Sequence, residues 1–464
     1  MLILTILFPL LGVAVSALPA ADRTRRGLYL AVMALTDALG AGTLAGGGRA
    51  VLFSLTPGFA LSFAADGMGK LFLALVLLLY SVSTVYSLEY LRHDGRQRVF
   101  FGFWFASLTA MLAVCLAGNL VSLYLCFELA TLSTMPLVLH DRTPEAVAAA
   151  LKYLFYSIGG ALLGLCAVLA LSMAGAGEFA YGGSLGEGGG ALRWAVFLGV
   201  VGFGTKAGMF PMNGWLPAAH PVAPAPASAI LSGVIVKAGI LAVIRLVWYS
   251  AGPELLRGTG AQTAWTVLAL CTVFLGSMMA WRERNLKRRL AYSTVSQLSY
   301  IMLGLSLLCE AGLRGALLHV CAHACAKGAL FLCAGGFLHC LGKREVSLLR
   351  GVGRRMPLTV WCFLLSGMSL IGLPPLGGFV SKWRIASAAL AEAPGVFVWL
   401  IPVMLLLSAL LTAAYLLPPV VEAFFPPRGQ EEPGERAEKA LMTVPTLLLC
   451  CASLALGLFG GALL

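Results

Sequence analysis

Residues 202–245 read GFGTKAGMFPMNGWLPAAHPVAPAPASAILSGVIVKAGILAVIR, and they set Lys206 and Lys237 in otherwise apolar sequence. A charged side chain at the centre of a bilayer costs at least about 2.5 kcal/mol, so such residues face protein or a water-filled cavity and mark ion or proton paths. Between the lysines, Pro211, Gly214 and four further prolines interrupt any helix. Freed backbone at that depth is tolerated only where protein or cavity water satisfies it. The stretch therefore predicts a discontinuous helix beside a polar passage.

The composition excludes a soluble globular protein. Hydrophobic residues make up 59% of the 464 and charged residues 11%, against about 25% charged residues in soluble domains. The net charge of +12 lies in short Lys and Arg clusters between apolar runs, a pattern typical of cytoplasmic membrane loops and not of nucleic acid binding. The chain is therefore predicted to be an all-α polytopic membrane protein with no nucleic acid partner.

No cofactor or metal site is expected on this chain. The twelve cysteines form no CxxC pair and are interpreted as small buried hydrophobic residues. The sequence has no phosphate-binding loop, nucleophile elbow, flavin or nicotinamide fingerprint, or haem or iron–sulfur motif. Redox catalysis by this chain alone is accordingly not expected.

Apolar windows of about 20 residues predict about fourteen transmembrane helices. The first is interpreted as a retained helix, because it lacks the basic start of a signal peptide. The predicted ranges are 1–20, 27–47, 67–88, 99–117, 119–140, 147–174, 192–214, 224–249, 261–281, 288–309, 312–340, 357–392 (broken), 397–424 and 440–463.

The charges of the connecting loops predict that both termini lie outside. With that orientation the inner loops hold the basic clusters within 23–26, 92–98, 282–289, 343–355 and 428–439, as well as Arg142. The outer loops hold only a few basic residues, such as Arg49, Arg257 and Arg314. This asymmetry follows the positive-inside rule. Of the loops themselves, the glycine-rich 46–48 and 175–190 are predicted to be flexible connections, and 426–439 a solvated mixed-charge surface loop.

A second interrupted span, GLPPLGGFVSKWRI at 372–385, contains Pro374 and Pro375 and is followed within eight residues by Lys382. The two breaks lie about 165 residues and five spans apart, as an inverted repeat in a transporter predicts. The expected organisation is two inverted five-helix repeats with broken seventh and twelfth helices. It divides the chain into 1–95 (helices 1–3), 96–250 (helices 4–8), 251–424 (helices 9–13) and 425–464 (helix 14).

Titratable residues at membrane depth are the candidates for proton transfer. Glu128 is the only carboxylate of the fifth span and Lys206 is its expected partner, while Lys237 lies in the middle of the eighth span. A third group consists of His319, His323 and Lys327. These residues are spaced i, i+4 and i+8 along about 12 Å of one helical face. This spacing suits a proton relay, with a polar seam between helices as the alternative.

The remaining polar residues at or near membrane depth carry weaker expectations. Lys382 is a gate candidate because of the neighbouring break. Lys152 and Lys70 are interpreted as snorkelling residues, whose charged ends reach the membrane surface. His220 is expected to shape the broken helix through hydrogen bonds.

In these motifs the sequence resembles the antiporter-like membrane subunits shared by respiratory complex I, Mrp-type cation/proton antiporters and membrane-bound hydrogenases. The resemblance extends from about Asp66 to Ala414 and is densest in YLCFELATLSTMPL, in residues 202–239, and in RRLAYSTVSQLSYIMLG, HVCAHACAKGALF and GLPPLGGFVSKW. It implies a fourteen-helix subunit with two inverted five-helix halves and a hydrated charged axis. By motif, the axis would comprise Glu128, Lys206, Lys237, His319, His323, Lys327 and Lys382.

The resemblance implies a proton-translocating subunit of a larger complex in a bacterial or archaeal-type cytoplasmic membrane, with Na+ as a second candidate ion. Protons would be taken up near Lys237 or His323, pass from Lys206 to Lys382 and leave outward, with Glu128 and Lys206 as the switch. Lysine at 382 and the absence of a long lateral helix disfavour a distal complex I subunit and leave Mrp-type antiporter and hydrogenase-like complexes open. A self-sufficient cation/proton antiporter and a non-conducting scaffold subunit are the alternatives.

Overall fold

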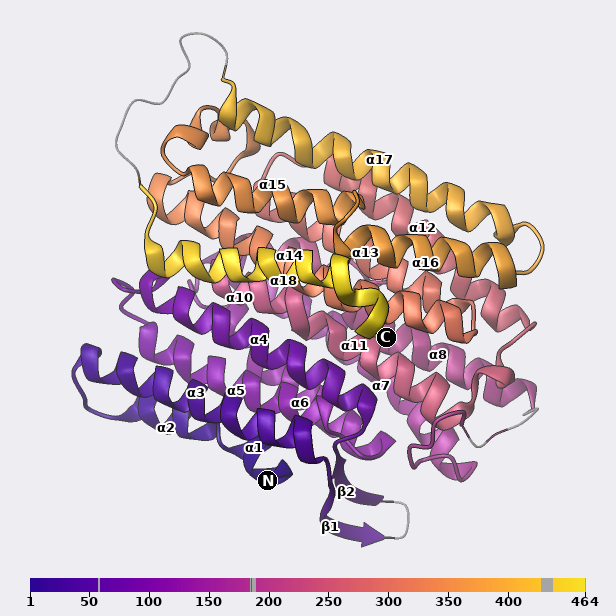
Figure 1. The fold of residues 1–464 in the computed structure, drawn as a ribbon. Coiled ribbons are helices and arrows are strands. Elements are labelled where there is room, and N and C mark those ends of the chain that lie inside the picture. Colours follow the sequence, from indigo (N-terminus) through magenta and orange to yellow (C-terminus); the bar gives the residue numbers. More distant parts are fainter. Residues whose placement is uncertain (57–58, 184, 186–188, 427–436, 464) are drawn as a thin grey trace. The chain divides into compact units, whose positions relative to one another are not determined.

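The computed structural model describes residues 1–464 except 57–58, 184, 186–188, 427–436 and 464 (Figure 1). The chain forms two compact units. The first unit comprises 1–84, 91–207 and 234–265, and the second comprises 85–90, 208–233 and 266–464. The chain is 79% helical, and ten of the described helices are long and apolar enough to cross a membrane. The prediction of a polytopic helical membrane protein is therefore confirmed.

The first unit is a helical assembly with one small sheet. Helix α7 packs against α6 and α8, and α8 also packs against α11. Its elements are α1 (Leu2–Leu7), α2 (Leu10–Ala17), α3 (Asp22–Gly46), β1 (Arg49–Thr56), β2 (Phe59–Ala64), most of α4 (Gly67–Tyr90), α5 (Gln97–Cys115), α6 (Leu120–Val138), α7 (Pro144–Met173), α8 (Gly190–Lys206), α11 (Val236–Ile244), the π-helix η2 (Arg245–Ala251) and the short 3-10 helix η3 (Pro253–Leu255).

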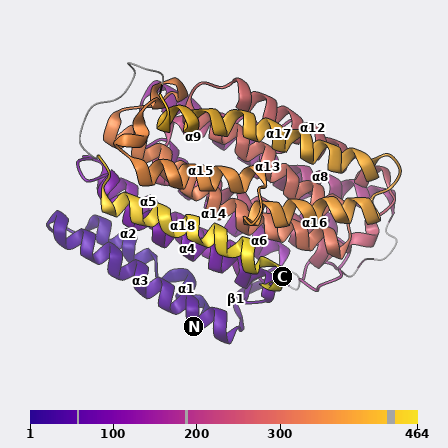
Figure 2. The ribbon, with the colours of Figure 1, turned by 45° about the horizontal axis from the view of Figure 1, so that its top comes forward.

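The second unit is organised around α14 (Glu310–Leu341), which packs against α10, α13, α15, α16 and α18 (Figure 2). Its central window is buried throughout. The other elements are α9 (Leu216–Val222), α10 (Ala225–Ile230), most of α12 (Gly260–Arg282), α13 (Leu286–Ser306), η4 (Val346–Leu349), η5 (Val352–Arg354), α15 (Pro357–Ile371), α16 (Gly377–Glu392), α17 (Phe397–Phe424) and α18 (Ala440–Leu463). A π-helical turn, η1 (Leu231–Ile235), precedes α11.

The predicted connection around 46–48 is shorter than expected, because Gly46 ends α3, Ala65 N donates to Gly48 O over 2.9 Å, and an antiparallel hairpin of β1 and β2 follows at once. Gly118 N donates to Ser62 O (2.9 Å) and Ala64 N to Leu116 O (2.7 Å), which anchors β2 beyond the end of α5. Val51, Leu52 and Phe53 are all exposed, so β1 lacks the apolar alternation that would have predicted a strand.

Two further loop predictions need correction. The 175–190 connection is hydrogen-bonded along part of its length, since Ala180 N donates to Tyr249 O (2.8 Å) and Gly182 N to Trp248 O (2.9 Å); residues 184 and 186–188 lie outside the described structure. Most of the 426–439 loop also lies outside it. Lys439, at the end of this loop, is described, and it forms an ion pair in addition to any contact with solvent: its Nζ donates to Glu89 Oε1 over 2.9 Å.

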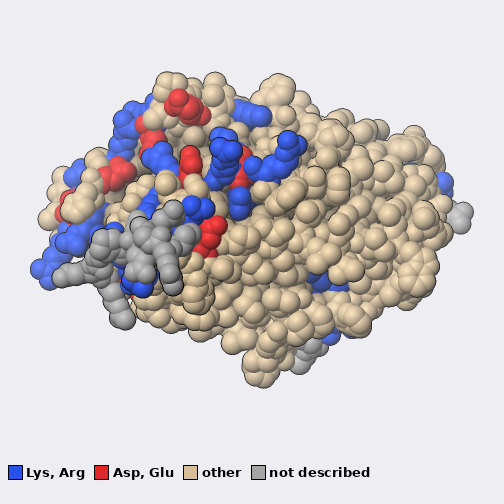
Figure 3. Space-filling view, turned by 90° about the horizontal axis from the view of Figure 1, so that it is seen from above, with Lys and Arg blue, Asp and Glu red and all other residues tan. Residues whose placement is uncertain are grey.

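Charged side chains gather at one end of the face seen in Figure 3. Lys, Arg, Asp and Glu are concentrated there, while most of the rest of the visible face is uncharged. Exposed arginines of the second unit include Arg282 at the end of α12, Arg284 in the connection to α13 and Arg288 in the first turn of α13. The clustering agrees with a lipid-facing surface between two aqueous ends.

An ion pair holds the first unit together beside α4. The buried Arg245 guanidinium forms two hydrogen bonds with the Asp66 carboxylate, of 2.5 and 2.6 Å, and lies 4.8 Å from the centre of the Phe179 ring and 4.5 Å from that of Tyr249. Burial alone would raise the pKa of Asp66, but Arg245 more than offsets this and holds the pKa below its usual value. The pair therefore stabilises the fold at neutral pH, and this contribution is lost as the pH falls below about 3.9, the usual pKa of an aspartate.

We expect Asp66→Ala to lower the free energy of unfolding by about 1–3 kcal/mol, because it leaves a buried guanidinium without its carboxylate. The partial exposure of Asp66 keeps the loss below that of a fully buried pair. Thermal unfolding of the detergent-solubilised protein measures it. The control is Arg49→Ala, which breaks the exposed Arg49–Glu178 pair and should cost less than about 1 kcal/mol. Equal losses in the two variants would contradict the assignment.

Candidate functional site

In the first unit, Lys206 occupies the last position of α8 and is only 1% exposed. Its ammonium donates a hydrogen bond to the hydroxyl of Thr131 on α6. The ammonium also lies 4.9 Å from the centre of the Phe127 ring and 5.4 Å from that of Tyr153. One hydroxyl and two aromatic faces thus replace part of the water shell of a buried cation.

Glu128 lies on α6, one turn before Thr131, and is half-buried. Its carboxylate is close enough to Lys206 for a Coulombic interaction. The Lys206 hydrogen bond goes to Thr131, however, and Glu128 Oε1 accepts no hydrogen bond from any residue that the structure describes. The expected Glu128–Lys206 partnership is therefore an interaction through space, with the hydroxyl of Thr131 as the direct contact.

The helix that carries Lys206 ends there for local reasons. Ala207 caps α8, and Gly208 follows with φ of +72°, a conformation that favours glycine. Pro211 and Gly214 lie in the non-helical residues before α9 begins at Leu216. The residues named as the first helix break thus coincide with an interruption of the helix.

Lys237 lies on α11 of the first unit and is 1% exposed. Two residues further on, a Cβ atom at Gly239 would lie 2.5 Å from Phe203 O and 3.0 Å from Lys206 Cβ, so α11 approaches the end of α8 at this glycine. Because two residues correspond to about 200° of helical rotation, Lys237 does not lie on the α11 face that meets α8. The α11 face that packs against α8 is therefore the face of Gly239, and Lys237 lies on a different face of α11.

In the second unit, the predicted relay residues on α14 are all fully buried. The rings of His319 and His323 have centroids 6.1 Å apart. His319 Nδ1 lies 2.9 Å from Ser381 Oγ on α16, and Lys327 Nζ donates to the carbonyl of Leu290 on α13 over 2.9 Å. The three side chains form a polar stripe on α14, and neighbouring helices contact His319 and Lys327 through oxygen atoms.

Lys382 lies on the second turn of α16, after the interruption that contains Pro374 and Pro375. Its ammonium donates to the carbonyls of Leu370 (2.5 Å) and Ile371 (3.1 Å), at the C-terminal end of α15. Carbonyls at a helix C-terminus have no intrahelical partner and carry partial negative charge. The helix break thus creates the acceptor group that holds Lys382 inside the protein.

Sequence reasoning missed several polar residues of the second unit. Tyr300 on α13 has its ring centre 4.7 Å from Lys382 Nζ and 5.5 Å from the ring centre of His319. Lys287, counted above as a loop residue, is buried and donates to Ala223 O at the end of α9 over 2.7 Å. The sequence signal for Tyr300 was a polar residue in an apolar span. Lys287 gave none, because it is the second residue of α13 and lies before the predicted span.

The expectation for His220 is wrong. Neither of its ring nitrogens has a hydrogen-bond partner among the described residues. The ring stacks on Phe331 with centroids 4.5 Å apart, and only the main-chain oxygen accepts a hydrogen bond, from Ser228 Oγ. His220 therefore packs against α14 by stacking instead of shaping α9 through ring hydrogen bonds.

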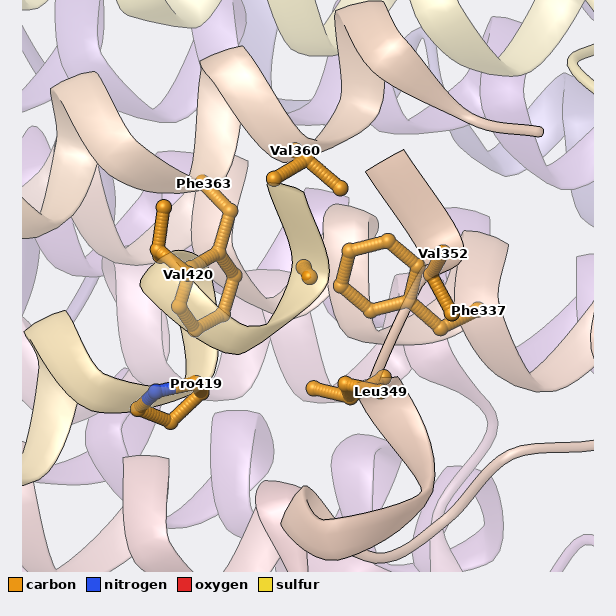
Figure 4. Close-up of a pocket in the computed structure, with 8 residues that line it drawn as sticks. Phe337, Leu349, Val352, Val360, Phe363, Pro419 and Val420 are labelled. Atoms are coloured by element: carbon orange, nitrogen blue, oxygen red, sulfur yellow. The ribbon is translucent and has the colours of Figure 1, made fainter. Parts of the chain in front are cut away.

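A cavity elsewhere in the second unit does not belong to this set. Figure 4 shows it between Phe337, Leu349, Phe363 and Val420. Its lining is apolar and includes none of the candidate residues. Such a lining cannot solvate an ion, so the buried lysines and histidines, and not this cavity, form the candidate site.

The fold and these residues define a polytopic membrane protein with titratable groups inside its helical units. The family described as NADH:quinone oxidoreductase/Mrp antiporter, TM, matches residues 117–412, and the chain belongs to this family. The resemblance seen in the motifs is thereby confirmed.

Curated relatives come from several kinds of complex. NADH-quinone oxidoreductase subunit N of Desulforudis audaxviator is 33% identical over 433 residues, which cover 87% of this chain and 83% of that protein. Hydrogenase-4 component B of Escherichia coli is 33% identical over 341 residues, which cover 70% of this chain and 50% of the relative. Na(+)/H(+) antiporter subunit A1 of Staphylococcus aureus is 31% identical over 440 residues, covering 88% and 54% respectively. The chain thus spans about half the length of the last two relatives.

Solved structures show the same fold. A chain of respiratory complex I from Thermus thermophilus with bound NADH matches with a TM-score of 0.84 and 25% identity, over 100% of this chain and 96% of that one. A chain of the Mrp complex from Dietzia sp. matches with a TM-score of 0.83 and 24% identity, over 99% and 95%. The architecture is therefore that of antiporter-like membrane subunits.

Proposed function

We propose that this chain is a proton-translocating membrane subunit of a larger complex. The observation that carries the proposal is the burial of Lys206, Lys237, Lys327 and Lys382 inside apolar helices. Buried lysines and histidines in membrane spans are expensive and are retained where ions or protons move. The names of the relatives, which are subunits of an NADH-quinone oxidoreductase, a hydrogenase and a Na+/H+ antiporter, support this class of function.

Each unit would carry its own set of proton-binding groups. Glu128, Lys206 and Lys237 serve in the first unit, and His319, His323, Lys327 and Lys382 serve in the second. Protonation of one group changes the proton affinity of the next through Coulombic coupling, which is strong where water is largely excluded. Glu128 and Lys206 act as the switch, and protons pass in order from Lys206 to Lys382.

The finer architecture belongs to the same proposal. It comprises fourteen spans and inverted five-helix repeats at 96–250 and 251–424. Both termini lie on the outer side of the cytoplasmic membrane. The helix interruptions after Lys206 and before Gly377 support the repeats, and the basic connections support the orientation. The partners are other membrane subunits, which supply the redox reaction or opposing Na+ gradient that drives transport.

Purification of the parent complex in mild detergent, followed by reconstitution into proteoliposomes, tests the proposal. We expect co-purifying membrane subunits and acidification or alkalinisation of the vesicle lumen when the complex is driven. Proton transport by the isolated chain, driven by Na+ alone, would favour a self-sufficient antiporter. Unchanged pumping after replacement of the buried lysines would favour a non-conducting scaffold subunit.

A further inference from the structure

Helix α13 carries a polar stripe that runs alongside the His319–Lys327 stripe of α14. The two helices are antiparallel neighbours in the second unit. Their register is given by three contacts: Gly304 with Gly312, Tyr300 with His319, and Leu290 O with Lys327 Nζ. Residues of α13 between Leu290 and Tyr300 therefore lie level with the α14 residues between Lys327 and His319.

Gln297 lies within this interval, on the same α13 face as Leu290 and Thr294, because the three are spaced i, i+4 and i+7. The register sets Gln297 level with the α14 turn between His319 and His323. Thr294 Oγ1 donates to Leu290 O over 2.9 Å, the same carbonyl that binds Lys327. The stripe thus leads from the Lys327 contact, past Thr294 and Gln297, to Tyr300.

The amide of Gln297 is fully buried, and neither Nε2 nor Oε1 has a hydrogen-bond partner among the residues that the structure describes. A buried amide left in this condition is unfavourable, and nearly all such groups in proteins are paired with protein atoms or ordered water. Buried waters make two to four hydrogen bonds to groups of this kind. An amide offers both donors and an acceptor, so it can orient a water molecule in either direction.

The two histidines need such a bridge. Their ring centroids lie 6.1 Å apart, and the Nε2 atoms of the two rings have no hydrogen-bond partner among the described residues, so these atoms are not joined directly. A bridging water is nearly as good as a direct hydrogen bond. It can accept a proton from one imidazolium and pass another of its protons to the next imidazole, with no net change in the water.

We propose that Gln297 is a positioning residue that holds the water joining His323 to His319, from which the proton continues toward Lys382 beside Tyr300. This inference rests on the proposed proton translocation and adds a group from α13 to it. Gln297 itself gains or loses no proton. Its role is to fix the position and orientation of the water between the two rings.

The test compares Gln297→Met, Gln297→His and Ser299→Ala with the wild type, each in the purified parent complex reconstituted into proteoliposomes. Methionine has nearly the same length as glutamine but cannot orient water, so proton translocation should fall about 10-fold or more, within the range that one positioned proton-transfer element contributes. Histidine retains a donor and an acceptor and should restore most of the rate. Among the described residues, Ser299 Oγ donates to Val295 O on its own helix, and the Ser299→Ala variant should match the wild type.

Two further measurements separate positioning from support of the fold. The melting temperature of the Gln297→Met complex should equal or exceed that of the wild type, because the variant removes an unpaired buried amide. A high-resolution map should show a water within about 3.2 Å of the wild-type amide and none at that position in the methionine variant. A methionine variant that pumps at the wild-type rate, or that loses melting temperature and activity together, would overturn the inference alone. A wild-type complex that moves no protons would overturn the proposed function with it.

Discussion

Replacement of Lys206 by methionine is expected to slow proton translocation by about 100-fold or more, because positioned acid–base groups contribute about 10²–10⁴-fold to proton transfer. The ammonium is the group that contacts Thr131 and acts on Glu128. Methionine preserves the length and the burial of the side chain. Thr131 Oγ1 keeps its hydrogen bond to Phe127 O (3.2 Å), so no hydroxyl is stranded and the fold should be retained.

The measurement is the initial rate of pH change in proteoliposomes, with complex assembly checked on native gels. Lys152→Met is the matched control, since Lys152 lies exposed on the neighbouring α7 and its charge can reach the membrane surface. We expect its rate to equal that of the wild type. A Lys206→Met complex that assembles and pumps at the wild-type rate would remove the first unit from the proton path.

Replacement of Gly202 by leucine is expected to abolish accumulation of the folded protein. A Cβ atom there would lie 2.5 Å from Gly160 O and 2.6 Å from Gly164 N, both of them backbone atoms of α7. Backbone cannot move aside as a flexible side chain can, so the cost should exceed the about 1–3 kcal/mol typical of an overfilled core. Gly202 also precedes Lys206 by one turn of α8, so any outward shift of the helix would carry the lysine away from Thr131.

Yield after detergent extraction and the melting temperature of whatever protein remains measure this effect. Gly27→Leu on α3 is the control, because a side chain at Gly27 meets nothing within 4 Å and faces outward. We expect normal yield from it. A Gly202→Leu protein as stable as the Gly27→Leu protein would contradict the close contact between α7 and α8.

Local sequence was sufficient where the governing physics is local. The helices at 67–90, 97–115 and 310–341 follow from the length of each apolar run, and the interruptions beyond Lys206 and before Lys382 follow from proline and glycine. The hairpin at 49–64 could not be predicted in this way, because β1 exposes consecutive apolar residues and β2 is held by hydrogen bonds with the end of α5.

The sequence by itself determined the class of protein and the titratable residues that lie inside it, because hydropathy and charge are read residue by residue along the chain. Only the tertiary structure decided their partners. Lys206 contacts Thr131, Lys382 binds carbonyls at the end of α15, and His220 stacks on Phe331. The physical reason is that a partner depends on the rotation and register of two helices, which are fixed by side-chain packing between segments distant in the chain.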